Sequence, residues 1–288
     1  MSNLRATVSK ILNFSCVDGP GNRLVIFLQG CNFNCQSCHN PHTIDLCDHC
    51  GDCVEGCPEN ALSMQDGKVV WDKTLCTQCD ECLKNCSRQS TPKTESYSVE
   101  EMLALIRKHS PFLSGVTVTG GEATLQARFI AEVFSAIKQD KALSHLSCMV
   151  DSNGFLSETG WQKLLPVTDG TMIDLKAWQQ ETHLRLTGRD NHKVMQSIQL
   201  LASENKLYEL RLLLIPGQTD LETEVDALAN FLTQLPPEVR IKLNAFQTHG
   251  VTGTASDWPA CSKEQIEGFA EKLNQRGISN LVLPTVYL

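Results

Sequence analysis

Two kinds of segment alternate along most of the chain: short, continuous apolar runs and longer amphipathic stretches. Short apolar runs indicate buried strands, and apolar residues that repeat every three or four positions indicate helices. The expected strands are residues 23–28, 115–119, 146–150, 170–175, 207–215 and 239–245, with 281–286 as a last strand or packed tail. The expected helices are residues 99–108, 125–138, 158–165, 180–186, 193–203, 221–235 and 263–276. This alternation predicts an α/β fold with a parallel sheet, as in a shortened TIM-like barrel of about six repeats.

Residues 43–93 interrupt the alternation. They are rich in Cys, Asp, Asn and Gln and contain no long apolar run. Such a segment cannot build an apolar core of its own, whereas metal–thiolate bonds can hold it together. We therefore expect a barrel formed by residues 14–42 and 94–288, with residues 43–93 as an inserted domain.

Polar motifs follow the apolar runs directly. They are residues 120–122, 151–154, 174–176, 216–217 and 244–246. The carboxyl ends of parallel strands open onto one face of a barrel, where active sites lie. We expect the active site on that face.

Composition narrows the class of protein. The net charge of −8 argues against a nucleic-acid partner, which would need a basic face. Met1–Phe14 has no apolar core of a signal peptide. The longest strongly apolar run, Leu210–Ile215, contains Arg211 and is too short to cross a membrane. The expectation is a soluble, cytoplasmic protein without a nucleic-acid or membrane partner.

Cysteine dominates the candidate chemistry. The chain has 14 cysteines, and most of them lie between Cys31 and Cys86. In a reducing cytosol, clustered thiols at regular spacing indicate metal ligands rather than disulfides. Cys16, Cys148 and Cys261 stand apart, and we expect each to be a small buried apolar residue rather than a ligand.

Eight of these cysteines form two identical runs with the spacing C-x2-C-x2-C-x3-C, which is typical of bacterial two-cluster ferredoxins. In that pattern the fourth cysteine of each run ligates the other cluster. The expected ligand sets are Cys47, Cys50, Cys53 and Cys86 for one [4Fe–4S] cluster, and Cys57, Cys76, Cys79 and Cys82 for the other. Both an electron relay and a structural role fit this pattern.

A third run, Cys31, Cys35 and Cys38, has the spacing C-x3-C-x2-C directly after the first expected strand. Three thiolates leave one iron of a four-iron cluster with an open coordination position. Open positions distinguish catalytic from structural metal sites. A zinc site completed by His39 or His42, or a third ferredoxin-type ligand set, is the alternative.

The C-x3-C-x2-C run resembles the signature of radical S-adenosyl-L-methionine (SAM) enzymes. Asp18–Arg23, Phe27, Gly30 and His39–Pro41 are similar to the subfamily that activates glycyl radical enzymes. The inserted cysteine runs resemble those of its larger members, which carry extra clusters.

The resemblance implies a partial (β/α)6 barrel whose SAM cluster is held by Cys31, Cys35 and Cys38. One electron would cleave SAM to methionine and a 5′-deoxyadenosyl radical. That radical would abstract a hydrogen atom from a glycine of a partner enzyme. A flavodoxin or ferredoxin is the implied electron donor.

The resemblance also implies roles for single residues. Gly120, Gly121 and Glu122 would meet the SAM amino group, and Asp174, Leu175 and Lys176 its ribose and carboxylate. Arg211 would approach SAM, Asp18 would contact the incoming substrate loop, and Ser37, Cys38, His39 and Gln247 would line the adenosine side. Asp151, Ser152, Met172 and Asp174 would form a monovalent-cation site. Ser37 and Gln247 depart from the family, which has an aromatic residue and a histidine there.

Two other functions fit parts of the sequence. A radical SAM maturase that modifies peptides would also carry auxiliary clusters, although usually after the barrel. A non-catalytic electron carrier would need neither an open iron nor a SAM pocket. Replacing Cys35 with alanine would leave its electron transfer intact.

Overall fold

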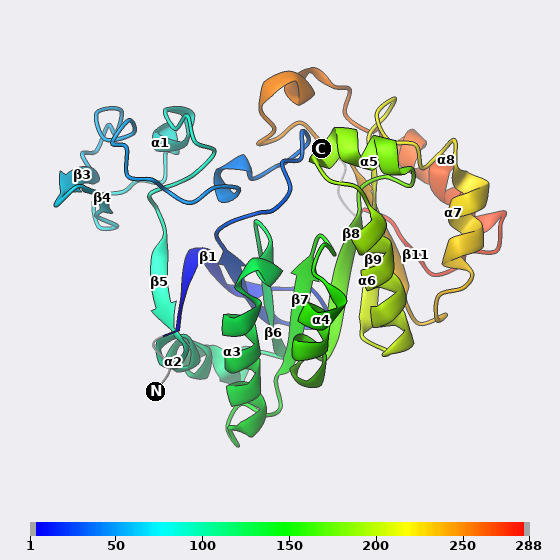
Figure 1. The fold of residues 1–288 in the computed structure, drawn as a ribbon, viewed down its shortest axis with the longest axis horizontal. Coiled ribbons are helices and arrows are strands. Elements are labelled where there is room, and N and C mark those ends of the chain that lie inside the picture. Colours follow the sequence, from blue (N-terminus) through cyan, green and yellow to red (C-terminus); the bar gives the residue numbers. More distant parts are fainter. Residues whose placement is uncertain (1–3, 285–288) are drawn as a thin grey trace.

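The computed structural model describes residues 4–284 and places most strands in one large sheet (Figure 1). The sheet has the strand order β11-β10-β9-β8-β7-β6-β2-β1-β5. Strands β2 and β6 to β11 run parallel to one another, as predicted. Their bounds are β2 Arg23–Leu28, β6 Gly115–Gly120, β7 Ser147–Ser152, β8 Gly170–Leu175, β9 Leu207–Leu214, β10 Arg240–Ala245 and β11 Leu281–Val282.

Helices connect these strands, and α3, α4 and α6 lie over one face of the sheet (Figure 1). The α-helices of the barrel are α2 Val99–His109, α3 Ala127–Gln139, α4 Glu158–Leu164, α5 Gln180–Thr187, α6 His192–Ser203, α7 Val225–Leu232 and α8 Lys263–Asn274. The 3-10 helices are η1 Pro41–Thr43, η2 Ser110–Phe112, η3 Ala123–Gln126, η4 Leu165–Val167 and η5 Gly253–Asp257. The predicted α/β alternation is confirmed. Of the last predicted strand, only Leu281–Val282 forms, and residues 285 and 286 lie outside the described part of the chain.

Capping and packing explain why the helices begin where they do. Ser98 accepts a hydrogen bond from Glu101 N, and the Glu101 carboxylate accepts one from Ser98 N. Ser262 and Gln265 form the same capping box at α8. Such boxes satisfy two backbone donors at once. The helices then bury their apolar faces against the strands in one continuous core.

The sequence did not predict the first strand. Strand β1 (Arg5–Ser15) pairs antiparallel with both β2 and β5 (Glu95–Ser98), so the sheet is mixed. Because β1 alternates buried and accessible positions, it has no continuous apolar run. Polar β5 pairs only with β1 in the sheet order, and one of its pairs is Arg5 with Ser98.

Residues 46–90 extend to one side of the barrel (Figure 1). They contain a hairpin of β3 (Leu62–Gln65) and β4 (Lys68–Trp71) and the one-turn helix α1 (Glu81–Lys84). Their own core is small and consists of Cys53, Leu62, Val69 and Cys82, two of which are cysteines. So small an apolar core supports the expectation that something besides the hydrophobic effect stabilises this segment. Within residues 4–284, no helix is both long and apolar enough to cross a membrane.

Candidate active site and cysteine hollows

The loop after β2 carries the three-cysteine run and is held by backbone hydrogen bonds on two sides. Towards η1, Cys31 N donates to Ile44 O at 2.8 Å. Towards the end of α5, Asn34 N donates to Thr187 O and Gln36 N donates to Leu186 O, both at 2.9 Å. These backbone hydrogen bonds hold the loop in place on both sides.

The thiols of this loop are partly buried, and burial is the main cause of their raised pKa values. It raises the pKa of Cys31 to about 11 and that of Cys35 to about 12. The Lys176 ammonium acts in the opposite direction on Cys35 and Cys38, so it lies within electrostatic range of both. Thiols in this environment become thiolates when a metal binds them.

Gly120 and Gly121, at the end of β6, let this strand approach the cysteine loop closely. A Cβ atom on Gly120 would lie 2.1 Å from Leu28 O, and one on Gly121 would lie 2.4 Å from Gly30 O. Gly120 also has a φ of +132°, which L side chains rarely adopt. The two glycines are thus required for contact between β6 and the end of β2.

Glu122 follows these glycines and is almost completely buried. Its Oε1 accepts hydrogen bonds from Thr124 N (2.9 Å), from Thr124 Oγ1 and from Ser152 Oγ (2.8 Å). Its Oε2 accepts one from Asn153 N at 2.7 Å. Burial raises the pKa of Glu122, although these donors oppose the shift. Glu122 therefore joins the ends of β6 and β7, with three of its hydrogen bonds on Oε1 and one on Oε2.

Lys176 lies just beyond the end of β8 and pairs with Asp174, with Nζ 2.8 Å from Oδ2. Burial alone would lower the pKa of Lys176, but Asp174 and the nearby Cys35 raise it above its usual value. Burial would raise the pKa of Asp174, but Lys176 and Arg211 hold it below the usual value. The pair is thus charged.

Arg211, on β9, connects two of the residues expected to bind a monovalent cation. Its Nη1 lies 3.0 Å from Asp151 Oδ2, and its Nη2 lies 3.1 Å from Met172 Sδ. Its Nε also donates to Glu209 Oε1 at 2.7 Å. Burial raises the pKa of Asp151 despite this partner. The guanidinium thus occupies the space between Asp151 and Met172, while the Ser152 hydroxyl is bonded to Glu122.

The loop after β10 reaches back to the cysteine loop. His39 Nε2 lies 2.9 Å from the backbone oxygen of Gln247, and the Gln247 side chain instead donates to Cys261 O at 3.3 Å. A Cβ atom on Gly250 would lie 2.4 Å from His39 O. Ser37, close by in sequence, is half-buried. The two loops that were expected to line the adenosine side thus contact each other.

Asp18 lies in the turn before β2, away from these loop contacts. Its carboxylate accepts a hydrogen bond from Ser15 Oγ at 2.5 Å, and its backbone oxygen accepts one from Thr117 Oγ1 at 2.6 Å. Arg23, which is fully buried, donates to Thr117 Oγ1 and to Val116 O. Arg23 thus holds this turn against β6, a role that its place in the Asp18–Arg23 motif did not predict.

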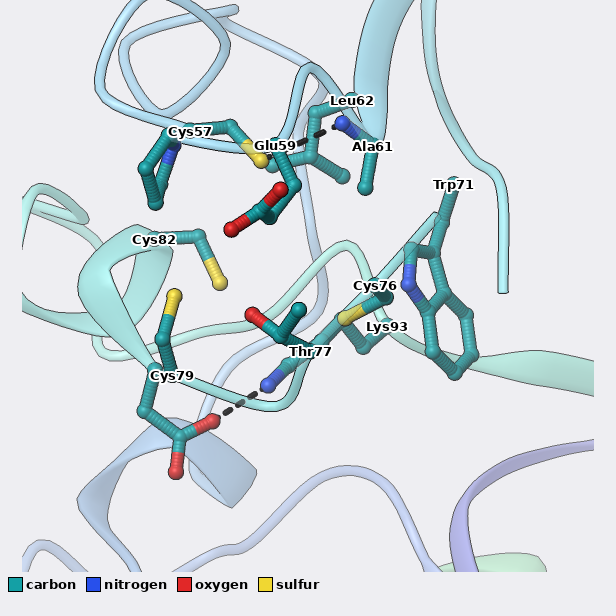
Figure 2. A pocket seen from close by; sticks show the side chains of 12 residues that line it. Cys57, Glu59, Ala61, Leu62, Trp71, Cys76, Thr77, Cys79, Cys82 and Lys93 are labelled. Atoms are coloured by element: carbon teal, nitrogen blue, oxygen red, sulfur yellow. Dashed lines mark hydrogen bonds and ion pairs between the residues drawn. The ribbon is translucent and has the colours of Figure 1, made fainter. Parts of the chain in front are cut away.

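The eight ferredoxin-type cysteines surround two hollows outside the barrel. One, here called the Cys76 hollow, is open to solvent, has about 320 Å³ of empty space and is lined by Cys57, Cys76, Cys79 and Cys82 (Figure 2). The other, the Cys47 hollow, is also open to solvent, has about 280 Å³ of empty space and is lined by Cys47, Cys50, Cys53 and Cys86. Each hollow therefore contains the fourth cysteine of the other run. The donor chemistry of both, four thiols around one space, fits a [4Fe–4S] cluster.

Other residues of the hollows carried no sequence signal. Trp71 and Lys93 line the Cys76 hollow, where Lys93 pairs with Asp80. Ser90 and Arg88 line the Cys47 hollow.

Within residues 4–284, no three His, Cys, Asp or Glu side chains are grouped so that they could ligate a single metal ion.

Comparison with known proteins identifies the family. The model of the Radical SAM superfamily matches residues 25–232. The (2S)-3-sulfopropanediol dehydratase activating enzyme of Klebsiella oxytoca is 31% identical over 96% of this chain and 96% of its own length. Pyruvate formate-lyase 1-activating enzyme of Escherichia coli is 28% identical over 85% of this chain and 83% of its own length.

Solved structures agree on the fold. Escherichia coli QueE, 14% identical, superposes with a TM-score of 0.53 over 98% of this chain and 95% of its own. SuiB of Streptococcus suis, bound to its precursor peptide SuiA, is 11% identical and reaches a TM-score of 0.59 over 91% of this chain and 48% of its own. Both have the same partial barrel as this chain. Together with the sequence matches, the fold and the three-cysteine loop show that the chain belongs to the radical SAM superfamily and, within it, to the glycyl-radical-enzyme activating enzymes.

Proposed function

We propose that Cys31, Cys35 and Cys38 hold the SAM-binding [4Fe–4S] cluster of this activating enzyme. The main support for this proposal is the position of the three cysteines. They lie on a loop held by backbone hydrogen bonds at the carboxyl end of β2, within electrostatic range of Lys176. When bound, the cluster supplies one electron that cleaves SAM to methionine and a 5′-deoxyadenosyl radical, which takes a hydrogen atom from a glycine of the partner. A loop fixed in advance holds the reacting atoms near contact.

The surrounding residues would bind and orient SAM. The Lys176 ammonium suits the SAM carboxylate, and Asp174 keeps it charged and in place. Glu122 Oε2, which accepts one hydrogen bond, can take a second from the SAM amino group. His39 and the loop at Gln247 would enclose the adenosine, because they already contact each other.

Arg211 has a different proposed role. Its guanidinium forms an ion pair with Asp151, whereas Asp174 forms its ion pair with Lys176. A monovalent cation bound by Asp151, Ser152, Met172 and Asp174 would require this guanidinium to turn towards SAM. Asp18 would contact the substrate loop from the turn before β2.

We further propose that residues 43–93 are a ferredoxin-like domain inserted in a barrel of residues 14–42 and 94–288. The two cysteine hollows support this, because each is lined by four thiols, one of them from the other run. With three clusters, the chain would belong to the larger activating enzymes. The insert would accept electrons from a flavodoxin or ferredoxin and relay them to the SAM cluster.

The partner enzyme follows from the family: it is a glycyl radical enzyme. The relatives named above activate a dehydratase and a lyase. The chain is 31% identical to the former and 28% to the latter. Candidate partners of both kinds therefore belong in the assay.

The test is an anaerobic reconstitution with iron and sulfide, followed by reduction and addition of SAM and a candidate partner. We expect about twelve irons per chain, SAM cleavage, and the EPR signal of a glycyl radical on the partner. Cys35→Ala should lose SAM cleavage and the radical. Cys16→Ala should retain both, because Cys16 lies outside the runs and is exposed, not buried as expected for it, Cys148 and Cys261.

About eight irons, with Cys31, Cys35 and Cys38 free or holding zinc, would refute the proposal. SAM cleavage by the wild type that persists in Cys35→Ala would do the same.

A further inference from the structure

Each cysteine hollow is lined by a residue whose buried hydrogen-bond donor has no partner among residues 4–284. Trp71 Nε1 is buried, makes no hydrogen bond and belongs to a residue that lines the Cys76 hollow. Ser90 Oγ is buried, makes no hydrogen bond and belongs to a residue that lines the Cys47 hollow. Buried donors of this kind are rare, because leaving them unpaired costs free energy. Their position indicates that something in each hollow accepts from them.

Trp71 is held in place by its neighbours. It ends β4 and pairs with Leu62 of β3, and the Lys73 ammonium lies 5.3 Å from the centre of its ring. Figure 2 shows the indole nitrogen on the side of the ring that faces Cys76 and the hollow. The hairpin thus holds the N–H group in this direction.

Ser90 lies in the segment that returns the chain from the cysteine runs to the barrel. Its residue exposure is 1%, and the neighbouring Thr91 is equally buried, at 2%. Asp45 N donates to Gln89 O at 3.1 Å, which anchors the segment just before Ser90. The Ser90 hydroxyl is therefore confined beside the Cys47 hollow.

Sulfur atoms in both hollows already accept backbone hydrogen bonds. Ala61 N lies 3.3 Å from Cys57 Sγ in the Cys76 hollow, and His49 N lies 3.4 Å from Cys47 Sγ in the Cys47 hollow. Hydrogen bonds to sulfur favour the reduced state of an iron–sulfur cluster, because reduction adds negative charge to it. A further donor would therefore raise the reduction potential.

We propose that Trp71 Nε1 and Ser90 Oγ donate hydrogen bonds to the sulfur atoms of the two auxiliary clusters and thereby set their reduction potentials. Each donor acts on one cluster: Trp71 on the cluster in the Cys76 hollow, and Ser90 on the cluster in the Cys47 hollow. Both residues contact a cluster through a hydrogen bond, and neither ligates iron. This inference rests on the proposed function, since it requires clusters in both hollows.

The test compares Trp71→Phe and Ser90→Ala with the wild-type holoenzyme. Phenylalanine keeps an aromatic ring but removes the N–H group, and alanine removes only the hydroxyl. In a redox titration followed by EPR, each variant should lower the midpoint potential of one auxiliary cluster and leave the other and the SAM cluster unchanged. The two variants should affect different clusters.

The matched control is Ser87→Ala, which removes a hydroxyl that bonds to Asp52 at 3.4 Å on the exposed surface. It should change no potential. Unchanged potentials in both Trp71→Phe and Ser90→Ala, or equal shifts of all three clusters, would overturn the inference.

A second measurement needs no variant. ENDOR spectroscopy of the reduced wild type in H2O and in D2O should detect an exchangeable proton coupled to each auxiliary cluster beyond those from backbone amides. Absence of such protons would also overturn the inference. Iron content separates the two failures: fewer than about twelve irons in the wild type refutes the proposed clusters, whereas full iron content with unchanged potentials refutes only the hydrogen bonds.

Discussion

Gly120 lies so close to Leu28 that a Cβ atom on it would be 2.1 Å from the Leu28 carbonyl oxygen. The glycine pair before Glu122 therefore has a structural task in addition to any contact with SAM. It lets the end of β6 support the loop that carries Cys31.

Gly120→Ala should consequently displace the cysteine loop. The substitution adds both a clash and an unfavourable φ of +132°, and together these should cost more than about 3 kcal/mol. We expect reconstituted protein to lose about four of twelve irons and its SAM cleavage. Iron content and product analysis would measure this.

The matched control is Gly188→Ala at the end of α5. Gly188 has a φ of +77° but nothing within 4 Å of its Cβ position. The Gly188→Ala variant should lose only about 1 kcal/mol of stability and keep its full iron content. Equal iron loss in both variants would show that backbone strain, and not the contact with Leu28, explains the effect.

The fourth cysteine of each run lines the hollow of the other run, and this arrangement leads to a second prediction. Cys57 belongs to the first run in sequence but lines the hollow of the second. Cys57→Ala should therefore damage the same cluster as Cys76→Ala, and its EPR spectrum after reduction should match that of Cys76→Ala. A spectrum that matched Cys47→Ala instead would mean that each run holds its own cluster.

The sequence predicted most of the fold because its buried strands are continuous apolar runs. Arg23–Leu28 was predicted with the bounds observed. Strand β1 was missed because its buried and accessible positions alternate only in part, so neither a continuous apolar run nor a strict alternation marks it. Strand β5 has the sequence ESYS, and its pairing with β1 is a tertiary contact that no local pattern encodes.

The candidate site was predictable where cysteine spacing dictates chemistry. The pairing of Cys57 with the second run followed from spacing alone. The directions of side chains could not be predicted from spacing. The Glu122 carboxylate joins two strands, and His39 contacts the backbone of Gln247, not its side chain. Trp71 and Ser90 lie beside the cysteines only because a hairpin and a returning segment bring them there.

Glu122 gives a pH prediction. Because burial raises its pKa above the ordinary 4.5, the carboxyl group is protonated at a higher pH than an exposed glutamate. Only the carboxylate attracts the SAM ammonium, so the Kd for SAM should rise as the pH falls through this raised pKa. Binding titrations of the reconstituted enzyme from pH 5.5 to 8.5 would measure this.

Glu122→Gln supplies the control for that experiment. The glutamine side chain cannot titrate. The variant should therefore bind SAM with a higher Kd than the wild type at high pH, and its Kd should lack this pH-dependent component. A pH dependence identical to that of the wild type would show that Glu122 does not contact the SAM amino group.

Arg211 and Asp151 form an ion pair whose side chains are only 12% and 14% exposed. Arg211→Met would leave the Asp151 carboxylate buried without its cation, and the loss of one partner from such a pair costs about 3–5 kcal/mol. The double variant Asp151→Asn with Arg211→Met removes both charges and should recover part of that stability. Thermal unfolding of the holoproteins, compared in a double-mutant cycle, would give the coupling. If the double variant is as unstable as the sum of the single variants, the pair contributes no coupling, and Arg211 is held chiefly by Glu209, to which its Nε donates at 2.7 Å.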